Sequence, residues 1–226
     1  MRKIIYIGLV AINVNGFLSA ASLASYDFTA SDHLWTSTGN WAWASGAWSA
    51  GFESVASIAT LTSPVMVLDK AGAVTVGVTH SYNFEYGFDG GRFEFTFDNG
   101  ANWNVIAQNL FTANPYSATV AIGDYGQQID GAVFTGYSGG PVTSYFTLGT
   151  GGQPKYETEG EQTLFEEGAE VQFRFLASWG NDDGPPAPNW QISTVTFETV
   201  VIPEPSHSAL AALAMGICIW RRKRLS

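Results

Sequence analysis

Residues 92–98 read Arg-Phe-Glu-Phe-Thr-Phe-Asp, and this strict alternation decides the fold class. Successive side chains of a β-strand point to opposite faces, so the three Phe share one face, while Glu94 and Asp98 share the other. Residues 73–80 repeat the scheme with alternate Val residues, and residues 171–175 repeat it with Phe. The pattern predicts half-buried strands with one face on a common core.

Glycine-rich turns separate these strand segments, at residues 89–91, 98–100, 138–140 and 149–152. The chain between them has no long helical period and no repeat of fixed length. Many short strands with frequent turns are typical of sandwiches and jelly rolls. We therefore predict an all-β antiparallel sandwich (jelly roll) over residues 25–201, with an N-terminal signal helix and a C-terminal transmembrane helix.

The charge of the chain is unevenly distributed. The 226 residues include 20 acidic and 10 basic side chains, a formal net charge of −10. Six of the basic residues lie at the two ends, so residues 25–201 carry four basic and nineteen acidic residues, a net charge of −15. Binding to nucleic acid or to an anionic membrane surface needs clustered Lys and Arg, so the body is not expected to bind nucleic acid.

The N-terminus has the pattern of a secretory signal peptide. Arg2 and Lys3 precede an apolar stretch over residues 4–18, and small residues follow from 19 to 25. A basic region, an apolar region and a small-residue cleavage zone in this order predict export. We assign residues 1–24 to the signal peptide, with cleavage after Ala20 or Ala24.

The C-terminal segment, residues 202–226, combines three features in fixed order. A Pro-Glu-Pro motif precedes an apolar stretch over residues 206–220 and a basic cluster; the residues are Pro203, Glu204 and Pro205, then Arg221, Arg222, Lys223 and Arg224. By the positive-inside rule, the apolar stretch would cross the inner membrane with its basic end in the cytoplasm. An ordinary tail anchor has the same physical pattern.

These C-terminal residues resemble the PEP-CTERM sorting signal of Gram-negative bacteria. The resemblance implies processing by an exosortase-type membrane protease and a mature protein at the cell surface or outside the cell. Many carriers of the signal belong to bacteria that make extracellular polysaccharide or biofilm. The single cysteine, Cys218, lies in the apolar stretch, so the exported body has no disulfide and depends on its core.

A local motif over residues 96–103 fits the Asp-box pattern, Ser/Thr-x-Asp-x-Gly-x-x-Trp. The pattern is familiar from sialidase propellers, which carry several copies. The chain has one copy, so we interpret it as a hairpin turn in which Asp98 accepts backbone hydrogen bonds and Trp103 packs beneath.

A second resemblance covers most of the body and points to MAM-type, concanavalin-like jelly rolls. It rests on the segments 63–68, 80–85, 89–94 and 98–103 and on the ending formed by 173–175, 182–183 and 190–192. Such domains often have an Asp where this chain has Ser193. Any metal-binding or structural role of that Asp is therefore in doubt here.

Carboxylates are the first candidates for catalysis. Glu94 and Asp98 lie at strand positions i and i+4. At about 3.3 Å per residue, their Cα atoms would be about 13 Å apart. The turn also uses Asp98, so we expect both side chains to lie on a solvated outer face. His80 continues an apolar strand face and is interpreted as a core or rim histidine with a hydrogen-bonding neighbour. The chain is therefore not predicted to be an enzyme.

Calcium is the most plausible cofactor, because an extracellular loop rich in acidic residues offers the oxygen ligands that Ca²⁺ requires. Two groups are candidates, one in the segment 85–89 and one in the Gly/Pro-rich loop 180–189, and a third acid lies near the first strand. The candidate metal ligands are Asp27, Glu85, Asp89, Asp182 and Asp183. The alternative is that these acids only cap turns.

Four tryptophans within fourteen residues allow two interpretations; they are Trp35, Trp41, Trp43 and Trp48. Exposed Trp rings would form a platform that stacks on sugars, with Tyr82, Tyr86 or Tyr137 nearby. Buried Trp rings would instead dominate the core.

The hypothesis for function is an exported, exosortase-processed surface or matrix protein. Its non-catalytic sandwich would bind glycan, an extracellular polysaccharide, or another surface protein. Two alternatives remain open. One is a secreted glycoside hydrolase with a concanavalin-like fold, and the other is a purely structural biofilm or coat protein.

Overall fold

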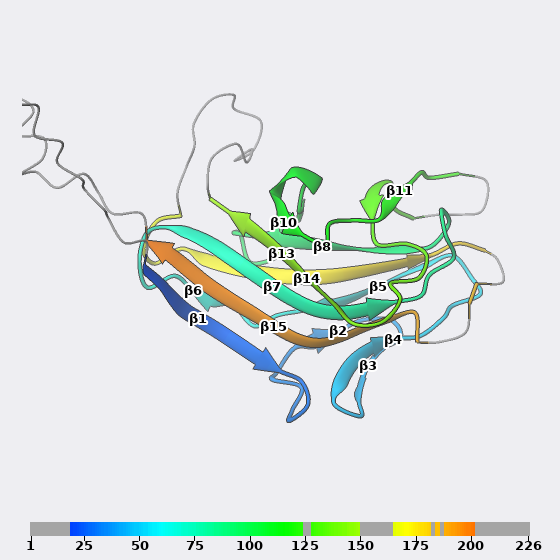
Figure 1. The fold of residues 1–226 in the computed structure, drawn as a ribbon, viewed down its shortest axis with the longest axis horizontal. Helices are drawn as coiled ribbons and strands as arrows, with labels where there is room; N and C mark the ends of the chain where they lie inside the picture. Colours follow the sequence, from blue (N-terminus) through cyan, green and yellow to red (C-terminus); the bar gives the residue numbers. More distant parts are fainter. Residues whose placement is uncertain (1–18, 124–127, 150–164, 182–183, 186–187, 202–226) are drawn as a thin grey trace, which may run out of the picture. The chain divides into compact units, whose positions relative to one another are not determined.

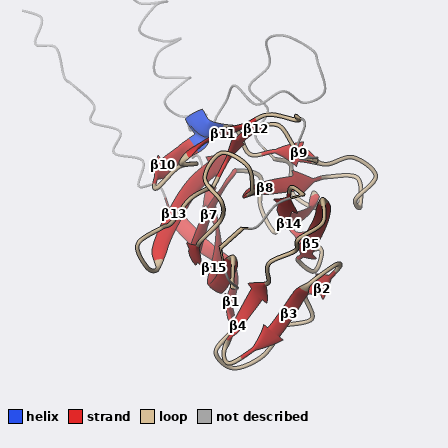
Figure 2. Ribbon diagram, turned by 90° about the vertical axis from the view of Figure 1, so that its right-hand side faces the viewer, coloured by secondary structure: helices blue, strands red, loops and turns tan. Residues whose placement is uncertain are grey.

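The computed structural model shown in Figure 1 describes residues 19–123, 128–149, 165–181, 184–185 and 188–201. Over these residues the chain forms two large antiparallel sheets that enclose a core, as predicted (Figures 1 and 2). Helical structure in the described part is limited to the 3-10 turn η1 (Gln108–Leu110). None of it forms a helix long and apolar enough to span a membrane. The predicted signal helix and transmembrane helix fall outside the described residues.

The first sheet is built around the two long strands β7 and β15. It has the order β10-β13-β7-β15-β4-β3, and β1 also pairs with β15. The strands are β10 (Phe111–Ala113), β13 (Val142–Leu148), β7 (Ala73–Tyr82), β15 (Trp190–Val201), β4 (Ala47–Ala50), β3 (Trp41–Ala44) and β1 (Ser19–Asp27).

The second sheet is built around β8 and β14, the strands that carry the alternating Phe segments. It has the order β2-β5-β14-β8-β9, and β6 also pairs with β14. The strands are β2 (Thr36–Ser37), β5 (Ser57–Thr62), β14 (Glu170–Trp179), β8 (Gly90–Thr96), β9 (Asn104–Val105) and β6 (Met66–Val67).

The core between the sheets is aromatic. Phe93 of β8 stacks on Trp190 of β15, with ring centroids 5.8 Å apart, and its ring also meets Phe175 edge-on. Gly91 lies where Trp190 inserts, because a Cβ atom there would be 2.3 Å from the indole ring. Such close packing, with no disulfide in the described part, agrees with a body held by burial of apolar surface.

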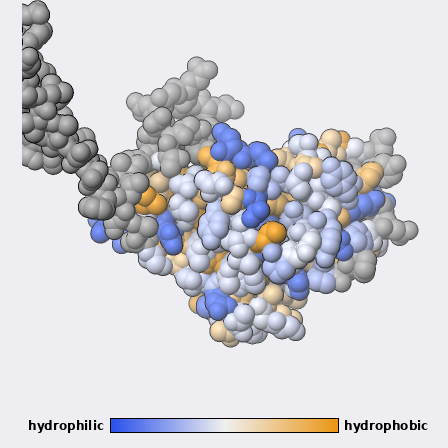
Figure 3. All heavy atoms as spheres, in the orientation of Figure 1, coloured by the Kyte–Doolittle hydropathy of each residue, from blue (hydrophilic) through white to orange (hydrophobic). Residues whose placement is uncertain are grey.

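The outer face of the first sheet is rich in threonine. Thr75 and Thr147 are hydrogen-bonded across β7 and β13 at 3.0 Å, and Thr79 and Thr143 form a second such pair at 3.0 Å. Figure 3 shows hydrophobic atoms on the face in view in small separate groups. Alternation along the strands thus separates a polar outer face from the core.

A small two-stranded flap lies on the outer side of the second sheet. It is formed by β11 (Ala118–Val120) and β12 (Gly131–Val133). Val120, Ile129 and Val133 bury Leu176, a side chain on the outer face of β14. The outer face is therefore covered at this end.

The first strand begins before the predicted start of the body. Contacts group Ala20–Val201 into one compact unit, and β1 starts at Ser19. Leu23 and Ala24, which the sequence assigned to the signal peptide, are partly buried against the core. The chain from about residue 20 thus contributes to the sandwich.

Candidate functional site

The tryptophan cluster is mainly part of the core. Trp35, Trp41 and Trp48 are 4–6% exposed, whereas Trp43 is 40% exposed. Trp35 stacks on Phe175 with ring centroids 5.4 Å apart, and Trp41 lies 5.6 Å from Trp190. Of the two interpretations, burial in the core therefore describes three of the four rings. Trp41, Trp43 and Trp48 share one face of the β3–β4 hairpin, and among them Trp43 is the one that is exposed.

The two most exposed aromatic side chains among the described residues lie on loops at one end of the sandwich. Tyr86 is 69% exposed and Tyr137 is 73% exposed. Tyr86 belongs to the β7–β8 connection, residues 83–89, and Tyr137 belongs to the β12–β13 connection, residues 134–141. Exposed tyrosines combine an apolar ring with a hydroxyl group, so they suit a binding surface.

Backbone hydrogen bonds join these two loops. Phe84 N donates to Gly136 O at 2.9 Å, and Asn83 forms an antiparallel bridge with Tyr137. The Thr135 hydroxyl accepts from Gly87 N and donates to Glu85 O, each at 3.0 Å. The tyrosines are thus carried by loops of defined backbone geometry.

Glycines shape the surface beside the tyrosines. The left-handed backbone of Gly136 lies beneath Tyr86, and a Cβ atom there would be 3.1 Å from the ring. Gly87, Gly139 and Gly140 also have positive φ and face open space. Because these positions have no Cβ atom, a ligand could approach the backbone beside the aromatic rings closely.

Asn189 fixes the third connection, residues 180–189, to the same end. Its buried side chain donates to Asn83 O at 2.8 Å and accepts a hydrogen bond from Trp179 Nε1 at 3.0 Å. Its backbone carbonyl accepts from Asn83 N at 2.8 Å. Asn189 is therefore a positioning residue that the sequence analysis did not identify.

Asp89 connects two of the predicted calcium groups. Its carboxylate is fully buried and accepts a hydrogen bond from Gly180 N at 2.8 Å, so the segment 85–89 meets the loop that carries Asp182 and Asp183. Those two acids lie outside the described residues. The carbonyl of Glu85 already accepts hydrogen bonds from the amides of Phe88 and Asp89.

Asp27 caps a turn after β1. Its exposed carboxylate accepts from the backbone N and the hydroxyl of Thr29, at 3.0 and 2.7 Å, and these hydrogen bonds lower its pKa. Within the described residues, no three His, Cys, Asp or Glu side chains gather into a possible metal site. Calcium binding stays a prediction, and two of its candidate ligands, Asp182 and Asp183, lie outside the described residues.

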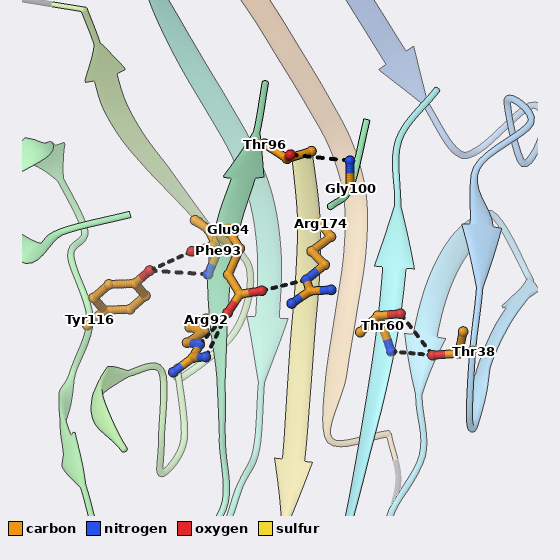
Figure 4. Close-up of polar contacts among 9 residues, drawn as sticks. All are labelled: Thr38, Thr60, Arg92, Phe93, Glu94, Thr96, Gly100, Tyr116 and Arg174. Carbon is orange, nitrogen blue, oxygen red and sulfur yellow. Dashed lines mark hydrogen bonds and ion pairs between the residues drawn. The ribbon is translucent and has the colours of Figure 1, made fainter. Parts of the chain in front are cut away.

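The candidate catalytic pair has other roles. Glu94 is buried rather than solvated, because its oxygens are held by Arg92 at 2.7 Å and by Arg174 at 2.5 Å (Figure 4). Asp98 accepts from Thr96 Oγ1 at 2.6 Å and from Asn102 N at 2.9 Å, so it forms the predicted turn. The expectation of a solvated outer face at Glu94 is wrong, since Arg174 approaches it from a strand eighty residues away in sequence.

His80 is a core histidine, as the strand pattern indicated. It is 1% exposed and hydrogen-bonded to Trp190 and Ser144. Burial lowers its pKa to about 3, so the ring is neutral at physiological pH.

Comparisons with known proteins give weak likenesses of fold. No protein-family model matches the sequence, and the search of curated proteins finds no match. A carbohydrate-binding module from Cellvibrio mixtus lichenase 5A, in complex with cellotriose, has 13% identity and a TM-score of 0.35 over 80% of this chain and 100% of that chain.

Two further solved structures have similar scores. The C-terminal carbohydrate-binding module of a laminarinase from Zobellia galactanivorans has 12% identity and a TM-score of 0.36, over 79% of this chain and 98% of that chain. The Emp46p carbohydrate recognition domain has 14% identity and a TM-score of 0.45, over 80% of this chain and 94% of that chain. At such identities, the likeness concerns the fold alone.

Proposed function

We propose that the body is a non-catalytic, glycan-binding jelly roll that uses Tyr86 and Tyr137 at its loop end. The observation that carries the proposal is the exposure of these rings, 69% and 73%, on two loops that are hydrogen-bonded to each other. Sugar rings have apolar C–H faces that stack on aromatic rings and hydroxyl groups that bond to tyrosine and to backbone. The chemistry of this surface fits both parts of a sugar.

The fixed backbone of the loops supports binding. A flexible loop must be ordered when ligand binds, and this ordering reduces affinity. Here Thr135, Ser138 and Asn189 each bond to the β7–β8 segment or to Tyr82, where that segment begins. The two tyrosines therefore need little rearrangement to accept a ligand.

The roles of Glu94 and Asp98 support a binding function over hydrolysis. A glycosidase needs two carboxyl groups that face one another, about 5–9.5 Å apart. One donates a proton to the leaving group, and the other attacks the sugar or activates a water molecule. Glu94 is paired with two arginines, and Asp98 is bound within its own turn. Neither side chain is presented to a substrate.

The export and sorting of the protein are part of the proposal and rest on the sequence. Residues 1–24 would direct export, and Pro203-Glu204-Pro205 with the apolar and basic segments behind it would direct exosortase processing. Replacing the Pro-Glu-Pro motif with three Ala residues should leave unprocessed precursor in the membrane fraction. Normal processing of that variant would contradict the sorting assignment.

The binding function is tested on a glycan array with the purified full-length protein. We expect binding that is lost in Tyr86→Ala/Tyr137→Ala and retained in Tyr145→Ala. Tyr145 is a matched control, because it is a 44% exposed tyrosine on β13 that packs beside Gly77. Binding to no glycan, or an equal loss in the control, would overturn the proposal.

A further inference from the structure

We infer that the outer face of the second sheet holds a separate binding site for an oxyanion of an acidic glycan, centred on Arg174. This site does not depend on Tyr86 and Tyr137. It is formed by side chains of β8, β14 and β5 and by Trp103 of the hairpin before β9. Figure 4 shows the ion pairs of Arg92 and Arg174 with Glu94 at its centre.

Glu94 holds two arginines in place. Its carboxylate is 2% exposed, and each of its oxygens contacts a different arginine. Arg92 contacts Oε1 through Nε and Nη2, and its Nη1 donates to Asp130 O at 3.2 Å. Each of the three guanidinium nitrogens of Arg92 therefore already contacts the protein.

Arg174 is only partly used. Its Nε donates to Glu94 Oε2, and its guanidinium lies 4.2 Å above the centre of the Trp103 ring. Among the described residues, Nη1 and Nη2 of Arg174 have no hydrogen-bond partner, and the side chain is 22% exposed. The guanidinium is thus fixed by an ion pair and a cation–π contact while its outer donors remain available.

Two threonines lie on the same face of the sheet as Arg174. Thr62 of β5 is opposite Arg174 in the sheet register, and Thr36 of β2 is opposite Thr62. Neither hydroxyl has a hydrogen-bond partner within the described part of the chain. The flap covers Leu176, which lies two residues along β14 from Arg174. The surface open to a ligand around Arg174 therefore extends toward β5 and β2.

The chemistry of this surface selects an oxyanion attached to a polyol. Two arginines and one glutamate leave a local charge of +1 on a body that carries −15. A guanidinium fork suits a carboxylate or sulfate. The acidic body opposes long polyanions such as nucleic acid. The few charges of a short acidic oligosaccharide bound at the fork are screened from distant acids over about 8 Å at physiological salt. Uronic acids and sulfated sugars both meet this requirement.

The test uses titration calorimetry on the full-length protein with a uronate tetrasaccharide, a sulfated tetrasaccharide and a neutral cello-tetraose. We expect at least one acidic oligosaccharide to bind. Arg174→Gln should weaken that binding about tenfold to a hundredfold, as expected for loss of charge-assisted hydrogen bonds. Lys70→Gln, which removes an exposed charge from the turn before β7, should leave it unchanged.

A second variant keeps every native contact of Glu94. In Thr62→Glu the new carboxylate would face Arg174 across the strand pair, within about 5.5 Å between Cβ atoms, and occupy its outer donors. We expect this folded variant to lose acidic-glycan binding while retaining any neutral-glycan binding at Tyr86 and Tyr137. Three results would overturn the inference: failure of both acidic sugars to bind, an equal effect of Lys70→Gln, or unchanged acidic-sugar binding by Thr62→Glu.

Discussion

The indole Nε1 of Trp190 donates a hydrogen bond to Nδ1 of His80 at 3.1 Å, inside the core of the sandwich. An indole N–H can only donate, so the imidazole proton must lie on Nε2, which is 2.9 Å from the Ser144 hydroxyl. The Ser144 hydroxyl then donates to the carbonyl of Asn114 at 2.6 Å. This chain of hydrogen bonds satisfies a buried histidine in its neutral form.

The stability of the protein should therefore fall in mild acid. Burial lowers the pKa of His80 from 6.5 to about 3, so between these values the unfolded state binds a proton that the native state does not. Its contribution to the free energy of unfolding is complete above pH 6.5 and decreases by about 1.4 kcal/mol per pH unit below it. Urea unfolding at pH 7 and pH 5 should show a loss of about 2 kcal/mol that His80→Gln removes. Equal pH dependence in the two proteins would contradict this assignment.

The Glu94 ion network makes a second prediction about stability. Glu94→Gln leaves two arginines without their common counterion, and breaking a buried pair costs about 3–5 kcal/mol when both partners are buried. Because Arg92 and Arg174 are 16% and 22% exposed, we expect about 2–3 kcal/mol by chemical denaturation. Glu198→Gln, at an exposed position of β15, is the matched control and should change stability by less than about 0.5 kcal/mol.

Close packing across the sandwich predicts the effect of Gly91→Ala. The added Cβ would lie 2.3 Å from Cζ3 of Trp190, whose ring also contacts Phe93 and Trp41. Overpacking of this kind costs about 1–3 kcal/mol, because the ring or β8 must shift. Thermal unfolding should show a clear decrease in Tm. A Tm equal to that of the wild type would mean that the two sheets are farther apart at this point.

The tryptophan cluster can be divided by mutation into core and surface members. Trp41→Ala removes a buried ring and should cost about 3–5 kcal/mol in the free energy of unfolding. Trp43→Ala removes a 40% exposed ring and its 2.9 Å hydrogen bond to Phe28 O, so about 1–2 kcal/mol is expected. Denaturant titration of the two variants measures the difference. A larger cost for Trp43 would contradict the burial pattern.

The sequence predicted the strands well because alternation is a local property. Phe93 and Phe95 face the core as expected, yet Phe97 is 39% exposed, although all three were expected on one face. Strand β8 ends at Thr96, where the turn begins, and Phe97 packs against Phe165 instead. Local turn chemistry thus ended the strand at Thr96, two residues before the end of the alternating pattern at Asp98.

The candidate sites were harder to predict because they depend on contacts between distant segments. Of the two arginines that contact Glu94, Arg92 could be expected from the sequence, because it lies two residues away on the same face of the strand. Arg174 could not, because it lies eighty residues away. Tyr86 and Tyr137 each lie beside glycine in a loop, which was the available signal that their rings are exposed. The meeting of their loops depends on Asn189 and Thr135, whose side chains give no sign of this in the sequence.

Strand β1 predicts where the signal peptide is cut. Cleavage after Ala20 would leave residues 21–27 to pair with β15, whereas cleavage after Ala24 would remove Leu23 and Ala24 from the core. A mature chain that begins at Ser25 would lose most of this strand pairing and the burial of Leu23, which is worth about 1–2 kcal/mol for a partly buried leucine. We therefore expect the exported protein to begin at Ala21, as measured by intact-mass spectrometry of the secreted form. A mature N-terminus at Ser25 would contradict this prediction. A protein that begins at Ser25 should then have the same Tm as one that begins at Ala21.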